Sequence, residues 1–263
     1  MKKLSLTSIF SLLVLMCFSQ MGSLALSVGV PQNSFRENTD ATGVGFDLSL
    51  AFPFQKSVPI YLGLDINYMV YGFNSENLDL SADIVAQDGT LIASLPIPLR
   101  VVNTNSIFGT HAFLRAVAPF DLIQPYAEGL VGFRYISTNT KIEDRSDELR
   151  WAEDPDESNL ISRTTVLDDW IFSYGFGGGF MIKIGRNAFI DLRANYFKGQ
   201  RAQYFDGTDT ESWEVSITDI GDISGQDDPQ IDDIGGDNLA LGSRPRESTT
   251  DLLTIKVGIA FKF

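Results

Sequence analysis

The sequence predicts an all-β fold, an eight-stranded antiparallel up-and-down transmembrane β-barrel with long extracellular loops. Three observations predict it. In eight separate segments, large apolar residues alternate with small or polar ones, as side chains do on the two faces of a strand. The connections between these segments are alternately short and long, which is the habit of outer-membrane barrels. The last segment ends on an aromatic residue, Phe263.

The overall composition excludes two other classes of protein. The 263 residues carry a formal net charge of -14 and give a pI of about 4.4, whereas binding to nucleic acid needs a basic surface. Beyond the N-terminus, the sequence has no run of about 18 apolar residues that would make an ordinary spanning helix. A transmembrane barrel needs no such run, because only every second residue of its strands is apolar.

The first residues have the pattern of a secretory signal peptide. Lys2 and Lys3 provide the positive n-region, and residues 9–18 form an apolar segment that is too short to span a membrane. We expect residues 1–19 to be the signal peptide and residues 20–263 to be the barrel domain. Cleavage after Ala25 is the alternative, but it would remove half of the first strand. Removal of the signal takes away Cys17, the only cysteine, so disulfide and thiol chemistry are not expected.

The eight alternating segments are predicted as strands in chain order. They lie near residues 23–30, 43–54, 60–70, 101–118, 124–138, 170–184, 190–196 and 251–263. In the last of them, the large apolar residues all share one parity, from Leu253 and Ile255 to Phe261 and Phe263. We expect this face of each strand to contact lipid and the opposite face to line the lumen.

The connections orient the barrel. Short turns are expected at 55–57, 119–123 and 185–187, and long loops at 31–42, 74–100, 138–166 and 198–249. Short turns face the periplasm in such barrels, so both termini are placed there. Residues 78–99 also alternate around Asp88-Gly89, a hairpin signal that would make ten strands. Pro96 and Pro98 remove ladder donors, so we interpret this region as a hairpin beyond the membrane.

A soluble lipocalin-like barrel, with its apolar face inward, is the alternative fold. The interior of an eight-stranded barrel holds little more than its own side chains or one small ligand. Six large apolar residues from most of the strands would not fit there. Small and polar residues suit this narrow interior, so the sequence favours the arrangement with the apolar face outward.

Several segments resemble a family of small outer-membrane β-barrel proteins of the Bacteroidota, of the OmpA/OmpX type. They are Val28-Gly-Val-Pro-Gln-Asn-Ser-Phe35, Asp40-Ala-Thr-Gly-Val-Gly-Phe46, Gln124-Pro-Tyr-Ala-Glu-Gly-Leu-Val-Gly-Phe133 and Asp168-Asp-Trp-Ile-Phe-Ser-Tyr-Gly-Phe-Gly-Gly-Gly179. The likeness covers the strands and not the long loops. It implies the fold and a location in the outer membrane of a Gram-negative bacterium, and little about activity.

Charged residues collect on the lumen-facing parity. Because charges in a narrow interior must be paired or hydrated, we expect a network of mutual salt bridges that plugs the lumen. A gated or narrow solute path is the functional alternative. The residues of this predicted network are Asp47, Asp65, His111, Arg115, Glu128, Asp191, Arg193 and Lys256.

No residue pattern indicates catalysis or a cofactor. The lone histidine, His111, shares its parity with Arg115 and is expected to point inward, whereas a lipid-modifying enzyme needs its site on the lipid side. One histidine and no cysteine make a poor metal site. Gly175, Gly177, Gly178 and Gly179 lie on a strand without a following helix, so they indicate close packing rather than a phosphate-binding loop.

The long loops hold most of the acidic residues. Loop 138–166 contains eight carboxylates between Glu143 and Glu157, and loop 198–249 contains eleven between Asp206 and Asp237. We expect a solvated acidic surface, with weak binding of divalent cations as the alternative, because the spacing does not match an EF-hand loop.

These observations predict a non-enzymatic outer-membrane barrel with a structural or surface-interaction role. A narrow porin for a small solute is the alternative, and a lipid-A-modifying enzyme is the second alternative. The expected partners are outer-membrane lipid and lipopolysaccharide, and the barrel-assembly machinery, which would recognise Phe261 and Phe263 in the last strand.

Overall fold

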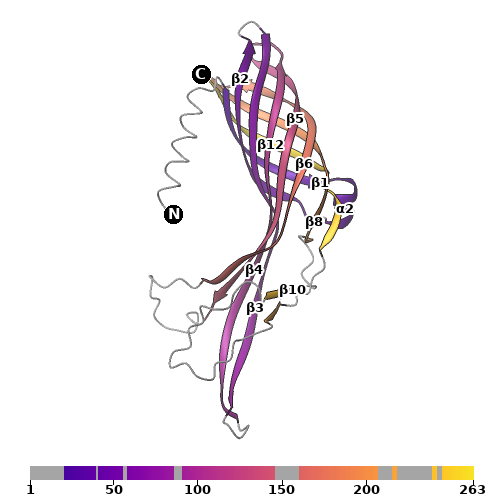
Figure 1. The fold of residues 1–263 in the computed structure, drawn as a ribbon. Helices are drawn as coiled ribbons and strands as arrows, with labels where there is room; N and C mark the ends of the chain where they lie inside the picture. The colour runs from indigo at the N-terminus through magenta and orange to yellow at the C-terminus, as the bar shows by residue number, and fades with distance from the viewer. Residues whose placement is uncertain are drawn as a thin grey trace.

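The computed structural model describes residues 21–39, 41–55, 58–85, 91–145, 160–206, 215–217, 239–241 and 245–263. Its main element is a closed antiparallel barrel with the spatial strand order β1-β12-β7-β6-β5-β4-β3-β2 (Figure 1). The predicted fold class is therefore confirmed, and the ten-strand alternative is wrong. The barrel strands are β1 Met21–Pro31, β2 Gly43–Gln55, β3 Val58–Val85, β4 Leu91–Val117, β5 Ile123–Asp144, β6 Leu160–Lys183, β7 Ala188–Gly199 and β12 Leu252–Lys262.

The barrel closes between its first and last strands. β1 pairs with β12 from Met21↔Lys262 to Pro31↔Leu252, and with β2 from Met21↔Ala51 to Gly29↔Gly43. Both edges of β1 are thus satisfied by backbone hydrogen bonds, and no edge of the barrel itself is left open to another chain. The C-terminus lies at the end that carries the short β2–β3 and β4–β5 connections, which we call the short-turn end.

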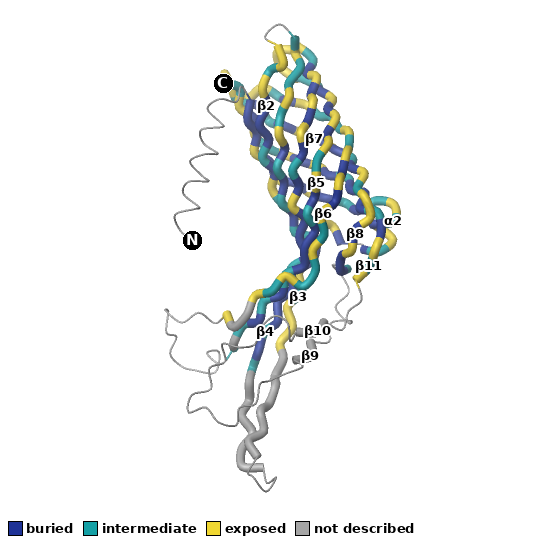
Figure 2. The backbone as a smooth tube through the Cα atoms, viewed as in Figure 1, coloured by how far each residue is buried: buried dark blue, intermediate teal, exposed yellow. Residues whose placement is uncertain are grey.

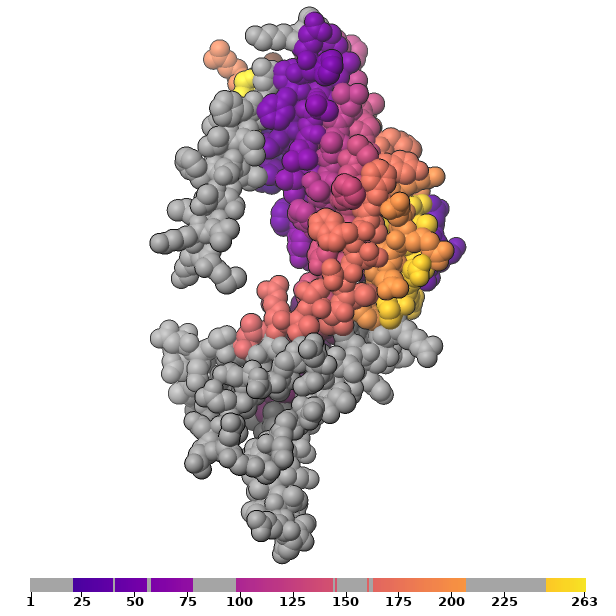
Figure 3. All heavy atoms as spheres, in the orientation of Figure 1, coloured from indigo at the N-terminus to yellow at the C-terminus, as the bar shows by residue number. Residues whose placement is uncertain are grey.

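Burial alternates along the strands as the sequence predicts. In β12, Thr254 and Lys256 are buried while Ile255 and Val257 are exposed. Buried and exposed stretches alternate along the barrel strands in the same way (Figure 2). In the space-filling view, side chains of successive strands form a continuous outer wall, coloured from indigo to orange (Figure 3). Large apolar side chains point outward along all eight strands, so the lipocalin-like alternative is wrong. Examples are Leu26, Phe46, Leu62, Leu114, Phe133, Phe176, Leu192 and Val257.

Four strands are longer than the sequence suggested. β2 leaves β3 at Val44↔Val70, but β3 and β4 stay paired as far as Val85↔Leu91. β5 and β6 follow for part of this length, as far as Glu143↔Leu160. The predicted loops 74–100 and 138–166 are therefore partly strand, because backbone pairing needs no lipid-facing side chains. The interpretation of 78–99 as a hairpin beyond the barrel agrees with this arm, and its Asp88-Gly89 turn lies outside the described residues.

The opposite end, which we call the arm end, is covered by short elements that the sequence did not reveal. Helix α2, Asn33–Asn38, follows β1, and β8, Arg201–Tyr204, pairs with β11, Arg246–Thr249. A further pair joins β9, Val215–Ile217, to β10, Leu239–Leu241. The predicted loops 31–42 and 198–249 thus contain secondary structure. Within the described ranges, no helix is both long enough and apolar enough to cross a membrane.

Candidate functional site

The candidate site is a cluster of charged side chains in the lumen, and Lys256 is at its centre. The Nζ atom of Lys256 donates to Asp47 Oδ2 at 2.5 Å and to Asp65 Oδ2 at 2.9 Å. These residues lie on β12, β2 and β3, so the contacts cross the closure of the barrel at β1. All three side chains are buried, and each carboxylate has a cationic partner.

Arg193 on β7 is the second cation of this cluster. Its Nη1 atom donates to Asp65 Oδ1 at 2.9 Å, and its Nη2 atom donates to Asp191 Oδ2 at 2.6 Å. The same guanidinium donates to the hydroxyl oxygens of Ser23, Ser49 and Tyr126 at 3.0, 3.2 and 3.1 Å. One planar group with five donors therefore joins four other strands across the lumen.

Arg115 and Glu128 form a third group on β4 and β5. Their side chains are cross-strand neighbours, and Arg115 Nη2 lies 2.6 Å from Glu128 Oε2. The guanidinium also lies over the rings of Phe113 and Tyr126, at 4.7 and 4.4 Å from the ring centroids. Tyr126 links this pair to the rest, because its hydroxyl donates to Asp191 Oδ1 at 2.5 Å.

Seven of the eight residues proposed for the lumen network are therefore brought together. We call them the ion-pair belt: Asp47, Asp65, Arg115, Glu128, Asp191, Arg193 and Lys256. Charges taken out of water are tolerated when they are paired and hydrogen-bonded. Tyr126, Ser23 and Ser49 complete the belt, and the sequence pattern did not single them out because a neutral hydroxyl gives no charge signal.

His111 is the cross-strand neighbour of Asp65, but it makes no ion pair with the described residues. Its Nε2 atom lies 2.6 Å from Ser173 Oγ, and its ring lies 4.6 Å from that of Phe197. Both His111 and Ser173 are buried inside the barrel, and the other ring nitrogen, Nδ1, has no hydrogen-bond partner among the described residues. A nucleophile needs a base that is itself oriented by a third group, so this pair lacks a catalytic arrangement.

Arg134 is a buried cation that the proposed network omitted. Its parity on β5 places it inside with Glu128, and it is 1% exposed. Its Nε, Nη1 and Nη2 atoms have no hydrogen-bond partner in the part of the chain that the structure describes. Its guanidinium carbon lies 5.6 Å from the ring centroid of Phe197. Its even-numbered position, shared with Glu128, already indicated that it faces the lumen. That no carboxylate is hydrogen-bonded to it depends on the fold.

Glycines on β6 make room for the belt. A Cβ atom at Gly177 would lie 2.0 Å from Asn195 Oδ1, and one at Gly179 would lie 2.7 Å from the Tyr126 hydroxyl. At Gly175 it would lie 3.0 Å from the ring of Phe197. The inner face of this strand is therefore flat, and side chains from β5 and β7 occupy the space. The prediction that these glycines serve close packing agrees with these distances.

Apolar side chains close the lumen on both sides of the belt. From the short-turn end to the level of the belt they are Met21, Ala51, Phe113, Val117, Tyr126, Leu130, Met181, Phe189, Phe197 and Ala260. At the arm end they are Phe35, Ala41, Met69, Tyr71, Ile107, Ile136, Ile171, Ala202, Tyr204 and Leu252. The belt thus lies between two apolar layers, an arrangement that excludes water from its ion pairs.

The cover at the arm end is fastened by polar contacts. Arg246 of β11 forms a salt bridge with Asp206 at 3.1 Å and donates from Nη1 to the Asn38 carbonyl at 2.5 Å. In α2, Phe35 packs edge-on against Tyr204 of β8, with ring centroids 4.9 Å apart. Burial raises the pKa of the Tyr204 hydroxyl. The cover is therefore a packed part of the barrel.

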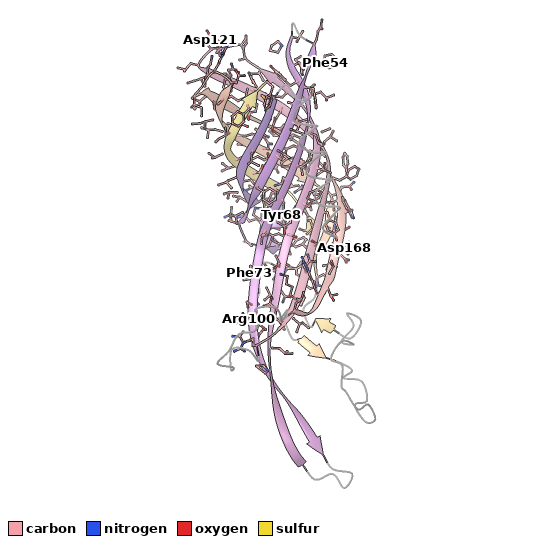
Figure 4. All side chains as sticks on the ribbon, turned by 90° about the vertical axis from the view of Figure 1, so that its left-hand side faces the viewer. Phe54, Tyr68, Phe73, Arg100, Asp121 and Asp168 are labelled. Carbon is pink, nitrogen blue, oxygen red and sulfur yellow. The ribbon has the colours of Figure 1, made fainter. Side chains whose placement is uncertain are left out.

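A shallow hollow lies on the arm. Its volume is about 490 Å³, and its lining residues are Phe73, Ser75, Asn77, Arg100, Val102, Lys141 and Glu143. Phe73 and Arg100 lie beyond Tyr68 and Asp168, away from the short-turn end where Phe54 and Asp121 are found (Figure 4). The lining is mixed in charge and polarity, and its residues do not form a catalytic set.

The acidic loops lie mostly outside the described residues. Among those that are described, no group of three or more His, Cys, Asp or Glu side chains is placed to hold a metal ion. Phe261 and Phe263, the proposed assembly signal, are 45% and 68% exposed. Phe261 shares the outward face of β12 with Ile259, and Phe263 directly follows the strand, so both are accessible at the rim of the barrel.

Comparisons with known proteins assign no family. No family model matches the chain, and its sequence matches no curated protein. Neisserial surface protein A is similar in structure at 9% identity, with a TM-score of 0.38, covering 93% of this chain and 98% of that one. Ail, the attachment invasion locus protein of Yersinia pestis, is similar at 10% identity with a TM-score of 0.35, covering 93% of this chain and 99% of that one. The outer membrane protease OmpT of Escherichia coli is similar at 10% identity with a TM-score of 0.33, covering 92% of this chain and 96% of that one. Likenesses at this level assign no activity.

Proposed function

We propose that this chain is an outer-membrane barrel protein with a closed lumen and a structural or surface-interaction role. The observation that carries the proposal is the distribution of side chains, because the outer wall of the barrel is apolar and its interior holds the charged ion-pair belt. An apolar outer surface of this extent is stable when it faces lipid, and a barrel leaves no backbone group unpaired there. The closed lumen favours this role over a narrow porin.

Aromatic side chains at both rims support a membrane location. At the arm end, Tyr135 packs on Trp170 with ring centroids 4.9 Å apart, and Phe46 packs on Tyr68 at 5.7 Å. At the short-turn end, Phe54 is exposed. Amphipathic rings at two levels are typical of the interfacial girdles of outer-membrane barrels. In this orientation the arm and the acidic loops are extracellular, and the short turns are periplasmic.

Export and assembly are part of the same proposal. β1 uses Met21 to Ala25 in pairs with both β12 and β2, which supports signal cleavage after Ser19 rather than after Ala25. The outward position of Phe261 and Phe263 supports recognition of the last strand by barrel-assembly machinery. Membership of the Bacteroidota barrels, contact with lipopolysaccharide, and weak cation binding by the acidic loops remain proposals that rest on the sequence.

Cysteine labelling of intact cells tests the location and the orientation together. With the signal removed, Phe73→Cys and Asp121→Cys each introduce the sole cysteine at an exposed position. We expect a membrane-impermeant maleimide to label the Phe73 variant on whole cells, and the Asp121 variant only after the outer membrane is opened. The reverse pattern would contradict the orientation, and equal labelling of both would contradict insertion.

Conductance of the refolded protein tests the closed lumen. We expect barrels inserted in a planar bilayer to remain silent, with a general porin as the positive control for insertion and detection. Steady unitary currents from the wild-type chain would overturn the structural role in favour of the narrow channel. Protease protection of the inserted barrel would show that silence does not come from failed insertion.

A further inference from the structure

Arg134 is the feature of the lumen that neither the ion-pair belt nor the proposed function explains. The guanidinium carries a full positive charge and five N–H donors. It is 1% exposed, and its three nitrogens have no hydrogen-bond acceptor among the described residues. An unpaired buried charge is costly, and proteins normally pair it or coordinate it. The face of Phe197, at 5.6 Å, accounts for only part of its environment.

None of the described carboxylates is hydrogen-bonded to Arg134, although the charge of Asp251 acts on its guanidinium through space. Within the belt, each carboxylate is bound to Lys256, Arg193 or Arg115. Asp251 lies nearer to the arm end, but its oxygens accept from Asn33 Nδ2 at 2.7 Å, from the Tyr196 hydroxyl at 3.2 Å and from the Gly199 amide at 3.3 Å. The counter-charge of Arg134 therefore does not come from direct contact with a described side chain.

Further donors converge on the same part of the lumen. A Cβ atom at Gly109 would lie 3.0 Å from Asn67 Oδ1, 3.2 Å from His111 Cε1 and 3.5 Å from Arg134 Cγ, so these three side chains surround this glycine. Asn67 Nδ2 and His111 Nδ1 have no partners there. If Ser173 donates its hydroxyl proton to Nε2, the ring proton of His111 is on Nδ1. The unpartnered atoms around Arg134 are then mainly donors.

We propose that Arg134 binds a single small monovalent anion, with chloride as the natural candidate, and that Asn67 and His111 donate to the same ion. An excess of N–H donors around a cation is the chemistry that recognises an anion, and exclusion of water strengthens each contact. The site lies between the two apolar layers of the lumen. Space is also limited at Gly199, where a Cβ atom would lie 2.6 Å from Arg134 Nη2. A compact ion suits this site better than phosphate or a carboxylic acid.

The proposal is tested on the full mature chain refolded into detergent. Unfolding midpoints in urea are measured while chloride replaces gluconate at constant ionic strength. We expect the midpoint of the wild type to rise with chloride and to saturate, because a ligand bound only by the folded state stabilises it. The rise should disappear in Arg134→Met and persist in Arg163→Met, which removes an exposed cation of β6.

Crystals grown in bromide give the second measurement. We expect an anomalous peak beside the Arg134 guanidinium of the wild type, and this result decides the matter even if Arg134→Met fails to fold. A wild-type midpoint that does not respond to chloride would overturn the proposal, since Arg134 would then be balanced through space by Asp251. Bromide peaks confined to the surface, or an unchanged chloride response in a folded Arg134→Met, would overturn it as well.

Discussion

At the scale of single residues, each charge of the belt depends on a particular partner, on the neighbouring strand for Glu128 and on the same strand for Asp191. Glu128 contacts Arg115, and Asp191 contacts Arg193, in both cases at 2.6 Å. Such pairs are weak evidence for net stability, but loss of one member leaves the other buried and unpaired. A single substitution in the belt is therefore expected to lower the free energy of unfolding more than a double substitution that replaces both members of a pair.

The first prediction concerns Glu128. We expect Glu128→Ala to lower the free energy of unfolding by about 3–5 kcal/mol, because Arg115 then loses its buried carboxylate. The double variant Arg115→Met/Glu128→Leu should recover most of this loss. Urea unfolding, followed by the heat-modified gel shift, measures both. The control is Glu247→Ala, whose pair with Arg201 is exposed, and an equal effect of Glu128→Ala and Glu247→Ala would contradict a structural belt.

The second prediction concerns the glycine face of β6. A Cβ atom at Gly177 would meet Asn195 Oδ1 at 2.0 Å and the Ala194 carbonyl at 2.5 Å. We expect Gly177→Ala to cost about 1–3 kcal/mol of stability through overpacking. Gly129→Ala on β5 is the matched control, because a Cβ atom there would meet nothing within 4 Å. Equal unfolding midpoints of the two variants would show that the interior beside β6 accommodates an extra methyl group without loss of stability.

At the scale of elements, the barrel and the arm are held together differently. Within the barrel, each strand has two hydrogen-bonded neighbours and two distinct faces. Beyond Val70, β3 pairs only with β4, and beyond Leu99 towards the tip β4 pairs only with β3. The part of the arm at 78–97 therefore contributes no hydrogen bond to the closure of the barrel.

The third prediction follows from this separation. We expect replacement of residues 78–97 by a two-residue Asn-Gly turn, which favours a tight hairpin, to leave folding and the unfolding midpoint of the barrel unchanged. The heat-modified gel shift and circular dichroism measure the outcome. The control is an equivalent shortening of residues 60–69 of β3 and 107–116 of β4, which removes hydrogen-bonded pairs of the barrel wall and should prevent folding. Loss of the barrel in the first variant would show that the arm guides assembly.

At the scale of the whole molecule, the two ends of the barrel differ. The short-turn end carries the C-terminus and exposed aromatic residues, and the arm end carries the packed cover and the long hairpin (Figure 1). Within the proposed function, this asymmetry sets the direction of insertion, because the larger polar elements remain on the cell surface. Residues at the short-turn end then stay on the periplasmic side, where the assembly machinery can contact them.

The fourth prediction separates assembly from stability. We expect Phe263→Ala to reduce the amount of assembled barrel in cells, because the last strand would be recognised less well. Its effect on the unfolding of refolded protein should be small, since Phe263 is 68% exposed. Quantitative blots of outer-membrane fractions, with urea unfolding in parallel, measure the two effects. Phe120→Ala, also at an exposed aromatic position, is the control, and equal assembly of both variants would argue against the terminal signal.

The sequence by itself determined which side of each strand faces outward and where the barrel strands lie. This is a local property, because side chains alternate with a period of two whatever the strand pairs with. Ser27, Asp65 and Lys256 could therefore be placed in the lumen from parity. The same rule predicted too little strand at 74–100 and 138–166, since strands outside a membrane need no apolar face.

Only the tertiary structure decided which interior groups meet. The contact of Arg193 with Asp65 joins β7 to β3 across the lumen, past β12, β1 and β2, and the contact of His111 with Ser173 joins β4 to β6 across β5. The packing of α2 and β8 over the lumen joins segments that are far apart in the sequence. The lack of a described hydrogen-bond partner for Arg134 is likewise set by the register of the whole barrel, which no local pattern encodes.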